Sequence, residues 1–189
     1  MGDKFVMSAR QADELDYALG RCGWSAADIK RLCEGDMAAT LLLVIRGHAE
    51  VVQVKHFINC DADPFLPKGW KGVEFHRKQG QFLWEPEKVR LHLAEGQQSG
   101  SVVGTDLRTA LEGKPVLNAN VLDYLLAHPH LIPESWKGKL VFFWGTIYRL
   151  ADGSLCVRYL SWDGSRWHWS CGWLDGRWRG RNPAAVLCE

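Results

Sequence analysis

The stretch that decides the fold is Leu140–Trp173, LVFFWGTIYRLADGSLCVRYLSWDGSRWHWSCGW. Its β-prone runs are Leu140–Tyr148, Leu155–Trp162 and Arg166–Trp173. Asp163-Gly164 separates the last two runs, and Asp-Gly is a dipeptide typical of a tight hairpin turn. A second Asp-Gly, at 175–176, precedes a short run around Trp178. The pattern predicts a meander of three or four antiparallel strands.

The region before this stretch, residues 49–135, mixes strand and helix signals. Strands are predicted at Glu50–Cys60, at Val73–His76 and Gln81–Trp84 as a hairpin, and at Val89–Leu93. Glu95–Gly104 is polar and bears glycine, which is typical of a mobile loop. Helices are predicted at Thr105–Gly113 and at Val121–Ala127, the second capped by Asn118 or Asn120.

Three short helices are predicted near the N-terminus, each preceded by a polar residue that can cap it. The caps are Ser8, Ser25 and Asp36. Met37–Ile45 is apolar nearly all round and is therefore expected to be buried. Such a unit is either a small helical bundle or a helix-turn-helix module, and the lack of a basic face favours the bundle.

These patterns together predict an α+β fold. Its parts are a helical subdomain at 1–48, a mixed α/β region at 49–135 and a Trp-rich antiparallel meander at 136–189. Because 189 residues suffice for one domain of ordinary size, the three parts are expected to form one continuous globular unit.

Charge and hydropathy exclude several classes of protein. The net charge of +1 excludes strong overall attraction to nucleic acid or anionic lipid, although local patches remain open. No apolar run approaches the ~20 residues that a membrane span requires. Met1–Arg10 lacks the pattern of a signal peptide, so a cytoplasmic location with no membrane partner is expected. The six cysteines contain no CxxC pair and are expected to be free thiols.

One set of motifs resembles a family of small uncharacterised bacterial proteins. The matching pieces are LNANVLDYLL (117–126), PHLIP (129–133), WKGK (136–139) and VFFWGTIY (141–148). The resemblance implies a bacterial, cytoplasmic origin. It implies no activity, and no functional residue is carried over from it.

The first candidate site is a strand end followed by a turn. His56, Asp61 and Asp63 lie around that turn, and His76 on the next strand could close the set, together with the thiol of Cys60. Carboxylates and imidazoles of this kind hold the metal ion of divalent-metal nucleases and hydrolases. The alternative, which we favour, is that Asp-x-Asp-Pro simply forms the turn, since Asp side chains accept backbone N–H bonds there.

The second candidate set is gathered around one predicted helix. Asn118, Asn120 and Asp123 lie near its start, and His128 and His130 lie at its end. Caps and acids are favourable at a helix start, and cations at a helix end. Each residue therefore has a structural role available, and that interpretation is preferred to catalysis.

The third candidate is the basic, aromatic C-terminal third. Seven of the ten tryptophans fall from Trp136 onward, where eight Lys and Arg face four Asp and Glu. The residues expected to bind nucleic acid or a partner are Arg166, Trp167, Trp169, Trp173, Arg177, Trp178, Arg179 and Arg181. Bases stack on aromatic rings and arginines bind phosphate, but a sheet must also bury one face, so any single Trp can be core.

The function that these patterns favour is a non-enzymatic binding module for nucleic acid or a protein partner, acting through the Trp-rich sheet. The alternative is a small metal-dependent hydrolase or nuclease centred on the Asp61 and Asp63 turn. No nucleophile elbow, P-loop or HExxH motif occurs, and no motif predicts a cofactor. An exposed, positively charged tryptophan surface would favour the binding module over the metal-dependent hydrolase.

Overall fold

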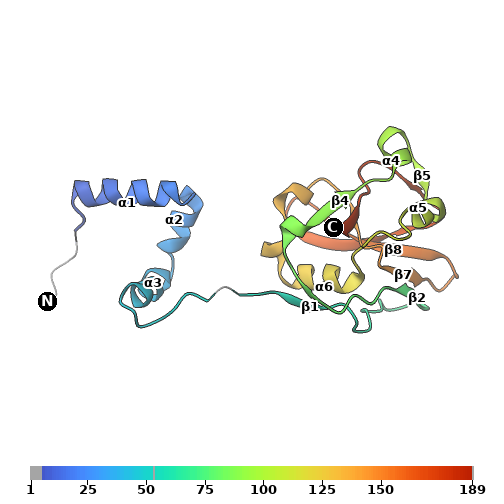
Figure 1. The fold of residues 1–189 in the computed structure, drawn as a ribbon, viewed down its shortest axis with the longest axis horizontal. Coiled ribbons are helices and arrows are strands. Elements are labelled where there is room, and N and C mark those ends of the chain that lie inside the picture. The colour runs from blue at the N-terminus through green and yellow to red at the C-terminus, as the bar shows by residue number, and fades with distance from the viewer. Residues whose placement is uncertain (1–5, 53, 189) are drawn as a thin grey trace. The chain divides into compact units, whose positions relative to one another are not determined.

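The computed structural model describes residues 6–52 and 54–188, and the chain divides into two compact units, Met1–Val54 and Lys55–Glu189. The first is helical and the second mixes helices with strands, so the fold is α+β, with Trp-rich antiparallel strands toward the C-terminus (Figure 1). The boundary between the units lies at 54/55, whereas the sequence predicted divisions at 48/49 and 135/136. Residues on both sides of position 135 belong to the second unit.

The first unit consists of α1 (Ala9–Arg21), α2 (Ala26–Leu32) and α3 (Met37–Ile45). Ser8 and Ser25 cap the first two helices, as predicted. Each forms a complete capping box: the serine side chain accepts the backbone N–H three residues on, and the side chain of that residue accepts the serine N–H. Asp36 precedes the third helix but makes no side-chain cap bond.

The prediction that Met37–Ile45 is buried is wrong. None of the three helices contains a buried residue, and Leu43 and Ile45 are 46% and 80% exposed. Trp24, Leu32 and Met37 line a shallow recess beside α2 and α3 in place of a closed core. Three helices this short do not surround one another, so the apolar stripe of each stays open to solvent.

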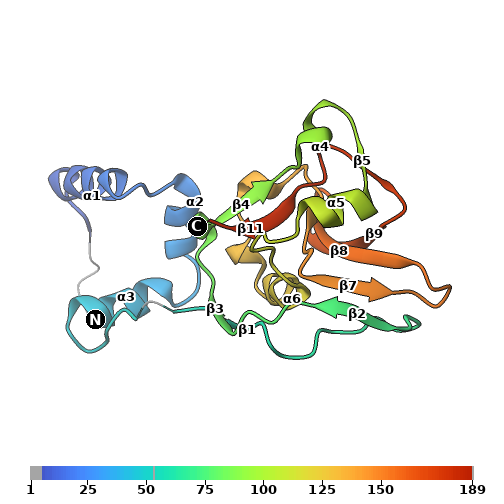
Figure 2. The same cartoon turned by 45° about the vertical axis from the view of Figure 1, so that its right-hand side comes forward.

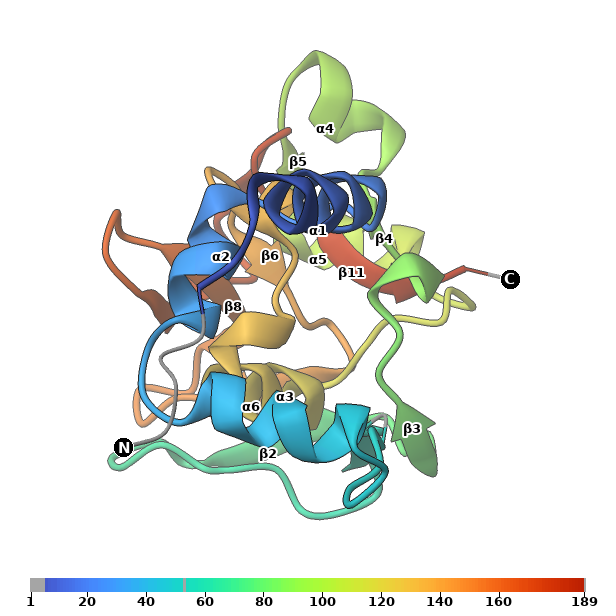
Figure 3. The same cartoon turned by 90° about the vertical axis from the view of Figure 1, so that its left-hand side faces the viewer.

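The second unit is built on a seven-stranded sheet. Six of its strands follow the order β2 (Gly72–His76), β7 (Thr146–Arg149), β8 (Leu155–Trp162), β6 (Val141–Phe142), β11 (Ala184–Leu187) and β4 (Val89–His92). The seventh, β9 (Trp167–Trp173), pairs with β8 through the predicted Asp163-Gly164 turn. All pairs are antiparallel except β6 with β11. Figure 2 shows β2, β7 and β8 side by side, and Figure 3 shows β11 beside β4.

The predicted strand Leu140–Tyr148 is interrupted. Its halves, β6 and β7, both pair with β8, and Phe143-Trp144-Gly145 bulges out between them. At Gly145 a Cβ atom would lie 2.8 Å from the Cα atom of Asn118, and the Gly145 N–H donates to Leu117 O at 2.8 Å. The break therefore lets the sheet approach the start of the preceding helix, α6 (Ala119–Ala127), at backbone distance.

Two small two-stranded sheets contain strands that the sequence predicted to pair differently. Among the described residues of the predicted strand Glu50–Cys60, only β1 (Phe57–Asn59) is a strand, and it pairs with β3 (Gln81–Leu83). The predicted hairpin between Val73–His76 and Gln81–Trp84 is wrong, because β2 pairs with β7 instead. The short strand at Trp178 is β10 (Arg177–Trp178), and it pairs with β5 (Val102–Val103) and not with β9.

The predicted mobile loop Glu95–Gly104 is ordered structure. It holds α4 (Glu95–Ser99), followed by β5 and the start of α5 (Gly104–Ala110). The side chain of Gln97 is 2% exposed and donates to the carbonyl oxygens of Arg179 and Asn182 at 3.2 and 3.0 Å. A buried amide that satisfies two backbone carbonyls fixes this segment against the C-terminal part of the chain.

Helix α6 (Ala119–Ala127) confirms the predicted cap. Asn118 is its N-cap, and its Oδ1 accepts from the Asn120 N–H at 3.1 Å. Short 3₁₀ turns complete the unit at Pro86–Lys88, Pro129–Leu131 and Glu134–Trp136.

Both faces of the sheet are covered, which decides where the tryptophans lie. One face packs on α6, with Leu160 and Trp167 against Leu122. The other packs on α5, with Val157 and Trp178 against Leu107. Figure 1 shows α6 and α5 on opposite sides of β8. Within the residues described, no helix has the length and apolarity needed to cross a membrane.

Candidate functional site

The predicted tryptophan platform is mostly core. Trp167 and Trp178 are 9% and 3% exposed, and Trp169 is partly buried beneath the guanidinium of Arg158 at 4.2 Å. The expectation of a one-sided meander fails because helices cover both faces of the sheet. Trp173, at the end of β9, remains 50% exposed.

The predicted arginines lie at the surface. Arg166, Arg177, Arg179 and Arg181 are all exposed. Trp173 and Arg177 line a recess of about 230 Å³ together with Tyr159 and Asn182. We call Trp173, Arg177, Arg179 and Arg181 the Trp173 surface. Arg166 lies outside it, near Asp163, at an N–O distance of 3.6 Å.

The predicted metal ligands do not converge. His76 is occupied by Thr146 Oγ1 at 2.8 Å and by the carbonyl of Cys60 at 3.1 Å. Asp61 accepts the N–H of the distant Gly80 at 2.8 Å, and the local turn bond is made by Asn59, whose Oδ1 accepts the Asp61 N–H at 3.0 Å. Among the described residues, no group of three or more His, Cys, Asp or Glu could hold a metal ion, so His56 and Asp63 do not complete a site with Asp61 and His76.

The polar residues of α6 organise the structure around that turn. Asn118 donates to the carbonyls of Cys60 and Arg77 at 2.8 and 2.9 Å, and Asn120 donates to those of Asn59 and Ala62 at 2.9 and 2.8 Å. These amides join the turn after β1 to the start of α6, so their role in the structure is architectural.

Asp123 has a partner that sequence reasoning missed. Arg158, on β8 and 1% exposed, donates to Asp123 through both terminal nitrogens, at 3.0 and 2.6 Å. Burial is the largest single influence and by itself would lower the pKa of Arg158, but the hydrogen bonds to Asp123, its charge and the nearby Tyr148 together raise that pKa above its usual value. The guanidinium is therefore charged inside the core. The alternation of strand residues placed Arg158 on one face of β8, but nothing in the sequence paired it with Asp123.

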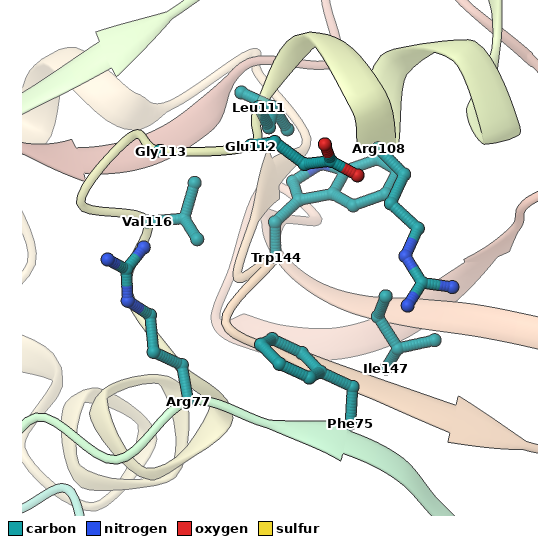
Figure 4. Close-up of a pocket in the computed structure, with 9 residues that line it drawn as sticks. All are labelled: Phe75, Arg77, Arg108, Leu111, Glu112, Gly113, Val116, Trp144 and Ile147. Atoms are coloured by element: carbon teal, nitrogen blue, oxygen red, sulfur yellow. The ribbon is translucent and has the colours of Figure 1, made fainter.

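A second recess, of about 310 Å³, lies where β2, β7 and α5 meet (Figure 4). We call it the two-arginine pocket. Its lining residues are Phe75, Arg77, Arg108, Leu111, Glu112, Gly113, Val116, Trp144 and Ile147. In Figure 4, Arg77 and Arg108 lie on opposite sides, with the rings of Phe75 and Trp144 between them.

Neither arginine of this pocket is neutralised within the described residues. The ion pairs among the described residues include neither Arg77 nor Arg108. Glu112, which also lines the pocket, is not within ion-pairing distance of either arginine. Arg77 Nη1 donates to the carbonyl of Lys114, which holds the side chain in place and leaves its other N–H groups for a ligand. Two arginines and one glutamate line this partly enclosed recess, so its local charge is net positive.

The wall of the pocket carries one more polar group. The indole Nε1 of Trp144 is buried and has no hydrogen-bond partner within the described part of the chain. Trp144 lies in the bulge between β6 and β7, and Phe75 is 42% exposed on the edge strand β2. An unsatisfied buried donor is costly, and this one lies beneath the surface of the recess.

Sequence reasoning did not find the two-arginine pocket. Its residues come from three segments spread over positions 75–147, and the two arginines lie in different segments. The one local signal was Gly145, which interrupts an otherwise continuous apolar run next to Trp144.

Comparisons of the chain with protein-family models, with curated proteins and with solved structures find no match.

Proposed function

We propose that the chain is a binding module for a small organic anion, held in the two-arginine pocket. The observation that carries this is the pair of unneutralised guanidinium groups on either side of two aromatic rings. A recess of about 310 Å³ lies at the lower end of the volumes that small-molecule sites have.

The lining defines the chemistry of the ligand. A carboxylate or phosphate group would accept charge-assisted bonds from Arg77 and Arg108, which are stronger than bonds between neutral groups. A flat apolar body would lie against the rings of Phe75 and Trp144. The proposal keeps the non-enzymatic character that the sequence favours and changes the place of binding.

Replacing Arg108 with alanine is expected to weaken binding of such an anion by about 10–100-fold, the effect of one lost hydrogen bond to a charged group. Calorimetry with benzoate and with phenyl phosphate measures this and separates carboxylate from phosphate ligands. Arg90→Ala, at an exposed position outside the pocket, is the control. Equal binding of uncharged benzyl alcohol, or an unchanged affinity in Arg108→Ala, would contradict the proposal.

A second candidate function rests on the Trp173 surface. Trp173 is 50% exposed beside Arg177, and the chain continues to Arg179 and Arg181, which are also exposed. A stacking ring next to several arginines is the arrangement that single-stranded nucleic-acid binders use. We therefore retain single-stranded nucleic acid as a partner, with one exposed ring in place of a platform.

Two substitutions test this candidate in a titration with oligo-dT at several salt concentrations. Trp173→Ala is expected to cost about 1–3 kcal/mol of binding with little change in salt slope, because stacking is not ionic. Arg177→Ala is expected to reduce the slope by about 0.7, because fewer counter-ions are released. If the wild-type chain shows no binding to oligo-dT even at low salt, the nucleic-acid function is excluded and a protein partner remains for this surface.

A further inference from the structure

The two-arginine pocket also contains one acid, and that acid has no cationic partner within the described residues. Glu112 lines the recess together with Arg77 and Arg108. The ion pairs of the described part of the chain do not include it. A glutamate that served to neutralise the pocket would pair with one of the arginines. Glu112 does not, so its carboxylate is available to a cationic group of a ligand.

The position of Glu112 in the chain favours a cation beside it. Glu112 directly follows Leu111, the C-cap of α5, and its backbone N–H donates to the carbonyl of Thr109 at 3.0 Å. The last carbonyl groups of a helix carry partial negative charge, which disfavours a carboxylate and favours a cation. The carboxylate of Glu112 therefore gains nothing from the helix, whereas an ammonium group placed there interacts favourably with both.

The turn that carries Glu112 also holds Arg77. Gly113 has φ +79°, a left-handed conformation that glycine adopts without strain, and it reverses the chain directly after Glu112. The next residue, Lys114, accepts a hydrogen bond from Arg77 Nη1 through its carbonyl oxygen. In Figure 4 the side chain of Glu112 extends toward the space between Arg77 and Arg108. One wall of the recess thus presents a cation and an anion from the same turn.

We propose that the ligand of the two-arginine pocket is an aromatic α-amino acid. This inference rests on the proposed function, because the carboxylate of the amino acid is the anion that Arg77 and Arg108 hold. Its ammonium group donates to Glu112, and its ring lies against Phe75 and Trp144. An anion without an ammonium group would be repelled by Glu112. A zwitterion instead matches charges of both signs on the wall.

The test is calorimetric titration of the full chain with phenylalanine and with 3-phenylpropionate, which differ only in the ammonium group. Glu112→Gln removes the negative charge and keeps the shape of the side chain, and the exposed position should tolerate it. The variant should bind phenylalanine about fivefold more weakly, the effect of one lost ion pair at an exposed position. It should bind 3-phenylpropionate at least as tightly as the wild type, because a repulsion is lost.

The difference between the two ligands separates charge recognition from damage to the fold, since a distorted pocket would bind both ligands more weakly. Glu87→Gln, at an exposed position outside the pocket, is the matched control and should bind both like the wild type. Unchanged phenylalanine affinity in Glu112→Gln, or an equal loss for both ligands, overturns the inference. The anion-binding function would survive that result if Arg108→Ala still weakens binding of 3-phenylpropionate. If the wild type binds neither ligand, the proposed function fails together with the inference.

Discussion

Asp123→Ala is expected to lower the free energy of unfolding by about 3–5 kcal/mol, the usual cost of leaving one member of a buried ion pair alone. Arg158 is 1% exposed and directs both terminal nitrogens at this carboxylate. Without Asp123 its charge would keep weaker partners, among them the ring faces of Trp169 at 4.2 Å and Phe65 at 5.4 Å. Urea denaturation followed by circular dichroism measures the change.

The ion pair between Arg149 and Glu74 provides the matched control. Its distance, 2.7 Å, is close to the 2.6 Å of the Arg158 and Asp123 pair, but its side chains are 35% and 34% exposed. Glu74→Ala should therefore cost only about 0.2–1 kcal/mol, because water solvates the remaining charge. Equal losses in the two variants would show that burial of Arg158 does not set the energy.

Asn118→Ala is the second substitution expected to have a large effect, about 2–4 kcal/mol of unfolding free energy, from a lost helix cap and unsatisfied buried carbonyls. The side chain is 0% exposed, caps α6 through Oδ1, and donates through Nδ2 to Cys60 and Arg77. Denaturant unfolding again provides the measurement.

Asn118→Ser separates the two contributions. A serine hydroxyl can accept from the helix N–H groups as the asparagine does, but it is too short to reach both carbonyls, so about 1 kcal/mol of the loss should be recovered. If the serine variant is as stable as the wild type, the bonds to Cys60 and Arg77 contribute nothing. If it is no better than alanine, the cap contributes nothing.

Local signals in the sequence predicted the elements that depend on local chemistry. The Asp163-Gly164 turn, the strand Val89–His92 and the cap at Asn118 are where the sequence placed them. A hairpin turn or an N-cap is fixed by two to four neighbouring residues, so their identity is sufficient.

Strand pairing was harder to predict, since it depends on residues far apart in the chain. Gln81–Leu83 pairs with Phe57–Asn59 and not with its neighbour β2, although the Lys78-Gln79-Gly80 segment was compatible with a hairpin. The same limit explains the tryptophans. Trp167 and Trp178 lie on strands that α6 and α5 cover, and coverage of a sheet by distant helices has no signature in the strand itself.

The candidate sites also combine features that local sequence determines with features that only tertiary folding determines. The exposure of Arg177, Arg179 and Arg181 was expected from their charge. By contrast, the approach of Arg77 to Arg108, and of His56 to His128, results from tertiary folding. His56 was assigned to one candidate set and His128 to another, and the packing of β1 along α6 joins them.

The position of β11 sets the order in which the sheet can assemble. β4, at residues 89–92, has β11, at residues 184–187, as its neighbour in the sheet, and β11 also joins β6 in parallel. During synthesis, at about 5–20 residues per second, β4 emerges from the ribosome several seconds before the strand that will pair with it. Its backbone groups and the apolar side chains of Val89 and Leu91 must stay unpaired for that time. Contacts of such long sequence separation also slow folding, because a long loop must close before any bond forms. β11 is made after the other strands of this sheet and yet lies in its interior, so this half of the sheet can be completed only after synthesis has reached β11.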